Sequence, residues 1–288
     1  MAPISRPAEA DLAIVYAGID PALLVHKPKP GPPRRMSSFV GGGVVLTVAS
    51  DAAGRRLVAL ELQGRAWAAG IGLKGPEVLA SASDGAWMLA RWVDAGEPSG
   101  AAYVKAALSA ADTIMAAQTP EFDVASTQWK ADPSDRWQRV ARLAAGRFPL
   151  SQWRAAKARA GALTQIQNAH GDFYFRNVMW TGDSVAIIDW EFVSQAPAYT
   201  DHLRLWSTLH DPADRDLALR IILAGADESK WRHVCLLGRW LSLRLLAENL
   251  SAPPAQRNPK DLAHARLIAR EGKSLAALTD SPGTLPTT

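Results

Sequence analysis

The sequence has 288 residues, enough for one large domain or two lobes with a sizeable core. Its 32 basic residues exceed its 28 acidic ones by only four and are dispersed along the chain, which argues against a nucleic-acid-binding surface. The single cysteine excludes an internal disulfide. No apolar run reaches the length of a transmembrane helix and no secretory signal is read at the N-terminus, so we expect a cytoplasmic protein without a membrane partner.

The first third of the chain alternates between turn residues and short apolar runs. Residues 27–35 contain four prolines and a glycine, which exclude a helix or a central strand and predict a stiff, basic loop. Residues 36–40 and 44–48 read as two strands joined by three glycines. A helix over 57–69, ended by a glycine, and a strand over 87–93 follow.

The pattern becomes mostly helical after a polar connector at residues 94–100. We expect helices over residues 102–117, 137–145, 153–168, 204–209, 213–224, 231–249 and 259–278.

The stretch from His170 to Asp189 carries the clearest chemistry. Two short apolar runs flank the pair Gly182-Asp183, which is the pattern of a β-hairpin with a two-residue loop. Antiparallel pairing across this loop puts Asn177 opposite Ile188, beside Asp189. Amide and carboxylate oxygens suit a hard cation such as Mg²⁺, and Asp172 in the preceding loop is a carboxylate that could act as a base.

This pattern resembles the aminoglycoside phosphotransferase and choline kinase group of protein-kinase-like enzymes. The resemblance rests on His-x-Asp-x-x-x-x-Asn from His170 and on Ile-Asp-Trp-Glu at 188–191. It implies a two-lobed α+β fold with a small, β-rich, nucleotide-binding N-lobe over residues 1–94. A larger, mostly helical C-lobe with the catalytic loop and substrate site would cover 95–280, and 281–288 would form a flexible tail.

Roles for individual residues also follow from the resemblance. Asp172 would orient or deprotonate the acceptor hydroxyl, and His170 would brace the loop around it. Asn177 and Asp189 would hold Mg²⁺ on the phosphates of ATP or GTP. Asp201 would cap the next helix and steady the catalytic loop.

The nucleotide-binding part departs from the pattern of the group. Glu61 fits the helix acid of that group, but its usual partner, a lysine or arginine on the third strand, is replaced by Thr47. An alternative alignment makes 57–62 the third strand, puts Glu61 at the lysine position and leaves no helix acid. The basic loop stands where a glycine-rich phosphate loop is expected, so Arg34 and Arg35 are candidates to bind the phosphates.

The function predicted from these features is phosphorylation of a hydroxyl on a small molecule, such as an antibiotic, a sugar or an amino alcohol. The missing lysine favours a rival function, a pseudokinase-like module that binds a nucleotide or a metabolite. A metal-dependent hydrolase built on His170, Asp172 and Asp189 is a third alternative, which leaves Asn177 unexplained. The sequence does not indicate an oligomeric state.

Overall fold

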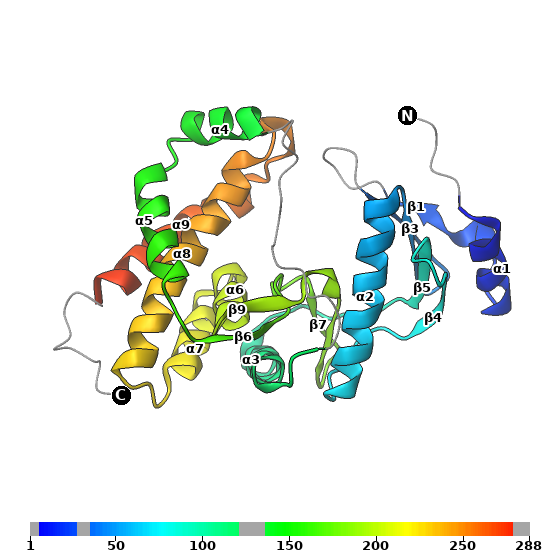
Figure 1. Ribbon diagram of the computed structural model, residues 1–288, viewed down its shortest axis with the longest axis horizontal. Helices are drawn as coiled ribbons and strands as arrows, with labels where there is room; N and C mark the ends of the chain where they lie inside the picture. The colour runs from blue at the N-terminus through cyan, green and yellow to red at the C-terminus, as the bar shows by residue number, and fades with distance from the viewer. Residues whose placement is uncertain (1–5, 28–34, 121–135, 279–288) are drawn as a thin grey trace. The chain divides into compact units, whose positions relative to one another are not determined.

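The computed structural model describes residues 6–27, 35–120 and 136–278 of the chain (Figure 1). The chain divides into two compact units. The first comprises Met1–Pro98, Thr119–Ala125 and Arg176–Val193, and the second comprises Ser99–Gln118, Ser126–Phe175 and Ser194–Thr288. None of the helices in the described part is long and apolar enough to cross a membrane.

Five antiparallel strands form the main sheet of the first unit, in the order β1-β2-β3-β5-β4. They are β1 (Val25–His26), β2 (Met36–Gly41), β3 (Val44–Ala49), β4 (Val78–Ser81) and β5 (Trp87–Arg91). Burial alternates along β3, where Val44, Leu46 and Val48 are buried, because successive side chains point to opposite faces of a strand. The two strands predicted at 36–40 and 44–48 are confirmed, whereas the strand predicted over 87–93 ends at Arg91.

Three helical segments accompany this sheet. Helix α1 (Ala8–Tyr16) packs on β5 and buries Ala10 and Ile14 in the core of the sheet, and a short 3-10 turn, η1 (Pro21–Leu23), follows it. Helix α2 (Ala52–Gly70) runs beside the sheet (Figure 1). Asp51 caps α2 by accepting a hydrogen bond from the backbone N–H of Gly54 at 2.6 Å. The alternative alignment that made 57–62 a strand is therefore wrong, and Glu61 lies in a helix.

The first unit also contains the hairpin formed by β7 (Val178–Trp180) and β8 (Val185–Ile187). A 3-10 turn, η3 (Trp190–Phe192), follows β8 and packs against α2. The close approach requires Gly64 of α2, because a Cβ there would lie only 2.6 Å from the Cβ of Trp190.

The second unit is mostly helical. Its helices are α3 (Gly100–Ala116), α4 (Arg136–Ala145), α5 (Leu150–Gly161), α6 (Thr200–Thr208), α7 (Pro212–Leu223), α8 (Glu228–Ser251), η4 (Pro254–Gln256) and α9 (Pro259–Ala277). The two longest C-terminal helices, α8 and α9, lie side by side, and α5 packs on α8 (Figure 1). A two-stranded sheet of β6 (Ile166–Ala169) and β9 (Ser194–Pro197) completes the unit.

One helix is shorter than predicted. The prediction of a helix over 153–168 is wrong beyond Gly161, because the chain turns there and residues 166–169 form β6. Strand β6 pairs antiparallel with β9, and the side-chain amide of Asn168 donates to the carbonyl of Ala117 at 2.6 Å. These long-range bonds outweigh the helical propensity of the local sequence.

Candidate active site

The β7–β8 hairpin has the register that the sequence predicts. The backbone N–H of Thr181 donates to the carbonyl of Ser184 at 2.9 Å and closes the two-residue loop. At the open end, the backbone N–H of Ile188 donates to the carbonyl of Asn177 at 3.0 Å. Asn177 is buried, with 2% of its surface exposed, and it lies opposite Ile188, the residue directly before Asp189. The hairpin thus brings the carboxamide and the carboxylate to the same end.

Asp189 sits where the chain leaves β8 and turns into η3. Its backbone is left-handed, with φ 62° and ψ 55°, a conformation that aspartate and asparagine tolerate better than most residues. The next residue, Trp190, is buried, and its indole N–H donates to the carbonyl of Ile187 at 3.1 Å. Because Trp190 is also packed against Gly64 of α2, the backbone at Asp189 has little freedom to move.

Glu61 is buried in α2 and pairs within its own helix. Its Oε1 lies 2.5 Å from Nε of Arg65, one turn further along, and Arg65 also donates to the carbonyl of Pro76 at 3.2 Å. Burial raises the pKa of the Glu61 carboxyl, the negative charge of Asp189 raises it further, and Arg65 acts against both. Arg65 therefore pairs with the helix acid from within α2, while Thr47 is half-buried in β3 opposite Ser38 and Met88 and brings no positive charge.

The sequence reasoning missed Arg65, although a signal for it was present. Residues at positions i and i+4 of a helix are neighbours, so an arginine four residues after a helix acid is a candidate partner.

The loop around Asp172 is organised by Asp201. The carboxylate of Asp201 accepts hydrogen bonds from the backbone N–H of His170 at 2.6 Å and of Gly171 at 3.2 Å. Gly171 has φ 85°, which a residue with a side chain rarely adopts. Burial raises the pKa of Asp201 to about 6, and the two backbone bonds oppose this shift. The prediction that Asp201 steadies this loop is confirmed, whereas the prediction that it caps the helix is wrong, because Tyr199 is the N-cap of α6.

His170 lies inside the loop and is fully buried. Its Nδ1 accepts a hydrogen bond from the backbone N–H of Asp172 at 3.3 Å, and its ring meets the edge of Phe173 at a centroid distance of 5.8 Å. These contacts fit a residue that holds the loop in shape.

The carboxylate of Asp172 is held by a buried arginine that the sequence reasoning did not find. Nη2 of Arg204 lies 3.3 Å from Oδ1 of Asp172 and 3.0 Å from Oε2 of Glu248, and Arg244 binds the other oxygen of Glu248 at 2.8 Å. Burial raises the pKa of Asp172, Arg204 opposes the shift and Glu248 adds to it. Burial would also raise the pKa of Glu248, but Arg204 and Arg244 outweigh it and hold that pKa below its usual value.

The burial of α6 is the feature that points to a partner for Arg204. All nine residues of α6 are buried, and a charge in such a helix needs partners because an unpaired buried charge is costly. The sequence does not show which carboxylates those partners are.

The predicted site residues fall into two groups. His170 and Asp172 belong to the second unit, whereas Glu61, Asn177 and Asp189 belong to the first. Of the two predicted phosphate-binding arginines, Arg34 lies outside the described residues. Arg35 is exposed, and its backbone carbonyl accepts from the N–H of Ser50 at 2.7 Å, just before α2 begins.

The oxygen donors of the first unit fit a hard divalent cation. Within the described ranges, no group of three or more His, Cys, Asp or Glu side chains is placed to hold a metal by itself. Magnesium is usually bound through one or two protein oxygens together with substrate phosphates, so Asn177 and Asp189 match its needs. Oε2 of Glu61 is a further buried oxygen, and it has no hydrogen-bond partner among the described residues.

Comparisons with known proteins show the family and the fold of this chain. The model of the family described as "Phosphotransferase enzyme family" matches residues 38–237. A search of curated proteins found no match. Among solved structures, a choline/ethanolamine kinase family protein from Mesorhizobium loti shares 17% identity with a TM-score of 0.56, covering 92% of this chain and 94% of its own.

Two further structures show the same relationship. A thermostable mutant of aminoglycoside phosphotransferase APH(4)-Ia, in a ternary complex with ADP and hygromycin B, shares 15% identity at a TM-score of 0.57 and covers 95% of this chain and 99% of its own. Macrolide 2'-phosphotransferase MphH from Brachybacterium faecium shares 17% identity at a TM-score of 0.56 and covers 96% and 99%. The predicted two-lobed, protein-kinase-like α+β fold is therefore confirmed.

Proposed function

This chain belongs to the phosphotransferase enzyme family, and from that premise we propose that it transfers the γ-phosphoryl group of ATP, with Mg²⁺, to a hydroxyl of a small molecule. That it is a small-molecule phosphotransferase acting on hydroxyl groups follows from the family. The observation that carries the proposal is the register of the β7–β8 hairpin, which brings Asn177 and Asp189 together.

The metal would be held by Asn177 and Asp189. Bound there, Mg²⁺ supplies neutralisation of the charge on the phosphate oxygens. The chain contributes the placement of the two donors, because hairpin pairing fixes Asn177 and the packing of Trp190 fixes the backbone of Asp189. Preorganised ligands of this kind need no rearrangement when the nucleotide arrives.

Asp172 would accept or direct the proton of the acceptor hydroxyl. Burial raises its pKa, and a carboxylate with a raised pKa is a better base near neutral pH than an exposed one. Arg204 keeps the carboxylate oriented and opposes this rise, so that Asp172 stays ionised over a wider range of pH. Asp201 fixes the backbone from which Asp172 projects.

The acceptor we propose is a neutral or weakly charged alcohol, such as a sugar, an amino alcohol or an antibiotic without several cationic groups. From His202 to the C-terminus the chain has nine acidic and twelve basic residues, which gives no acidic excess to attract a polycation. Kanamycin and gentamicin should therefore be poor acceptors.

A second candidate function is a pseudokinase-like module that binds a nucleotide without efficient transfer. The observation that favours it is the absence of a cation at Thr47, together with the engagement of Glu61 by Arg65 inside α2. The hydrolase alternative has no support of this kind, since the family is one of phosphotransferases.

The test is an assay of ADP release, with ATP and Mg²⁺, against a panel of macrolides, aminoglycosides, sugars and amino alcohols. Transfer is confirmed when the phosphorylated acceptor appears by mass spectrometry in step with ADP, and when both disappear in the Asp172→Asn variant. Tight binding of Mg–ATP without transfer to any acceptor would instead support the pseudokinase function. Efficient phosphorylation of kanamycin would contradict the proposed acceptor class.

A further inference from the structure

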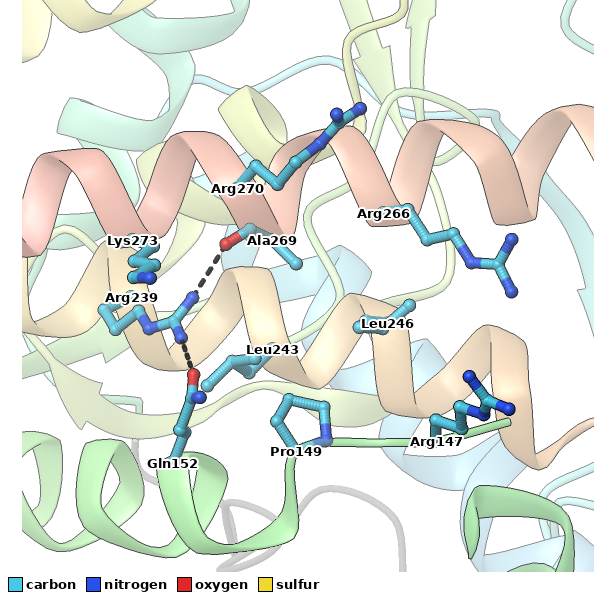
Figure 2. Close-up of a pocket in the computed structure, with 10 residues that line it drawn as sticks. All are labelled: Arg147, Pro149, Gln152, Arg239, Leu243, Leu246, Arg266, Ala269, Arg270 and Lys273. Atoms are coloured by element: carbon cyan, nitrogen blue, oxygen red, sulfur yellow. Dashed lines mark hydrogen bonds between the residues drawn. The ribbon is translucent and has the colours of Figure 1, made fainter. Parts of the chain in front are cut away.

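The second unit contains an open pocket that none of the proposed catalytic residues lines. It has a volume of about 530 Å³ and lies among α5, α8, α9 and the turn before α5 (Figure 2). The apolar residues that line it are Pro149, Leu243, Leu246 and Ala269. Pockets of this size are typical of small-molecule sites.

The charged side chains of this pocket are all basic. They are Arg147, Arg239, Arg266, Arg270 and Lys273, and no acidic residue is among the residues that line it within the described part of the chain. Two acids on the same helices have other partners: Glu271 pairs with Arg215 at 3.0 Å, and Glu248 pairs with Arg204 at 3.0 Å. The pocket therefore concentrates positive charge next to apolar surface.

Arg239 is fixed in place before any ligand binds. Its guanidinium donates to the carbonyl of Ala269 in α9 and to Oε1 of Gln152 in α5, both at 2.7 Å, so it ties three helices together (Figure 2). Lys273 lies beside it, whereas Arg147 and Arg266 lie toward the opposite end of Leu243 and Leu246 (Figure 2). The cations are thus spread around an apolar centre.

We propose that this pocket binds a small molecule that carries two or more acidic groups, phosphate or carboxylate, on an apolar body. Cations that surround one pocket without acids repel one another, and a polyanion relieves that repulsion while its apolar part covers the two leucines. Arg239 offers a donor whose position is already ordered, which reduces the entropy lost on binding. The inference stands apart from the proposed function, because it uses none of the residues assigned to phosphoryl transfer.

The probe for this site is naphthalene-1,5-disulfonate, which has two fixed anions on an apolar ring system and no hydroxyl to be phosphorylated. Its binding to the full-length protein is measured by isothermal titration calorimetry at low and high salt. The test variant is Arg266→Glu with Lys273→Glu, since both side chains are exposed. The control is Arg232→Glu with Lys260→Glu, which makes the same change of charge on α8 and α9 at exposed positions away from the pocket.

We expect one binding site that weakens with salt. We also expect a loss of affinity of at least about tenfold in the pocket variant and little change in the control, since charge-assisted hydrogen bonds are the strong ones. Failure of the parent to bind the probe, or an equal loss in both variants, overturns the inference. The double variant Arg266→Gln with Lys273→Gln repeats the test without new negative charge, in case the reversed charges disturb the packing of α9. Loss of affinity with this pair supports the site, and unchanged affinity overturns it.

Discussion

Nη2 of Arg204 lies 3.3 Å from Oδ1 of Asp172, and the same nitrogen lies 3.0 Å from Oε2 of Glu248. One buried guanidinium is therefore shared between the carboxylate proposed to act on the acceptor hydroxyl and a second carboxylate that Arg244 also holds. Because Arg204 opposes the effect of burial on the pKa of Asp172, it sets the pH range in which that carboxylate is ionised.

Replacing Asp172 with asparagine should preserve the fold and lower kcat by about 10²–10⁴-fold, the usual loss when a general base is removed. The isosteric change keeps the shape of the side chain and its contact with Arg204. Circular dichroism and calorimetric titration of Mg–ATP serve as controls, and both should match the parent. Turnover equal to that of the parent would show that Asp172 does not act on the acceptor.

Replacing Arg204 with methionine should move the acid limb of the pH profile of kcat/KM to higher pH. The reason is that Arg204 holds the pKa of Asp172 down, so its removal lets burial and Glu248 raise that pKa further. Arg204→Lys keeps one positive charge but not the planar guanidinium that reaches both carboxylates, so its profile should fall between those of the parent and the methionine variant. A change in protein stability alone would lower activity at every pH and leave the limb in place.

The hairpin could be predicted from the sequence because its signal is local. A two-residue loop fixes the register of both strands, so the positions of Asn177 and Asp189 follow from counting residues away from Gly182-Asp183. Helix α2 was predicted over 57–69 but begins at Ala52, and its cap Asp51 is a local signal that the prediction did not use.

The contacts that fix Asp172 could not be predicted in this way. Arg204 and Glu248 lie 32 and 76 positions beyond Asp172, and only packing of α6 against α8 brings them together. Strand β6 was mistaken for helix for the same reason, because its partner β9 lies well outside any local window. Long-range pairing decides such elements against local propensity.

Asp201 should make the free energy of unfolding depend on pH. Its pKa is about 6 in the folded protein, against an ordinary value of 3.8, so the folded state keeps a proton that the unfolded state releases. The contribution of Asp201 to the free energy of unfolding is therefore fully present below about pH 4 and is lost as the pH rises to about 6. The total loss is at most about 3 kcal/mol. Urea unfolding across this range should show the parent losing stability relative to Asp201→Asn. A difference between the two proteins that does not vary with pH would contradict the shifted pKa.

Asp189→Asn should weaken the binding of Mg–ATP by at least about tenfold, because it removes a charge-assisted interaction. Asparagine also tolerates the left-handed backbone at this position, so the fold should be unaffected. Asn177→Ala should weaken binding less, since its oxygen carries no full charge. Titration calorimetry with and without Mg²⁺ separates the metal-dependent part.

Asp183→Asn provides the matched control for this pair. Asp183 is an exposed carboxylate in the turn of the same hairpin, where it accepts a hydrogen bond from Ser184 at 2.8 Å. Its removal should leave nucleotide binding unchanged. Unchanged affinity in all three variants would remove the metal site from Asn177 and Asp189.

Arg34→Ala combined with Arg35→Ala should raise the KM for ATP by about tenfold or more, because each guanidinium can form a charge-assisted, bidentate contact with phosphate. The physical need for such contacts follows from Thr47, which supplies no positive charge in β3, and from Arg65, which is engaged with Glu61. Phosphoryl transfer leaves anionic oxygens that require neutralisation beyond that given by Mg²⁺.

Lys27→Ala is the control for the arginine pair, because it removes a cation from the start of the same basic segment. The Lys27 ammonium lies 5.4 Å from the centre of the Trp92 ring, and its backbone N–H donates to Ser38 at 2.8 Å. A side chain already engaged with an aromatic ring is a poorer phosphate ligand, so the KM for ATP should change little. Equal values of KM in the arginine pair, the lysine variant and the parent would remove the segment from the nucleotide site. The phosphates of ATP would then have no basic partner from this segment.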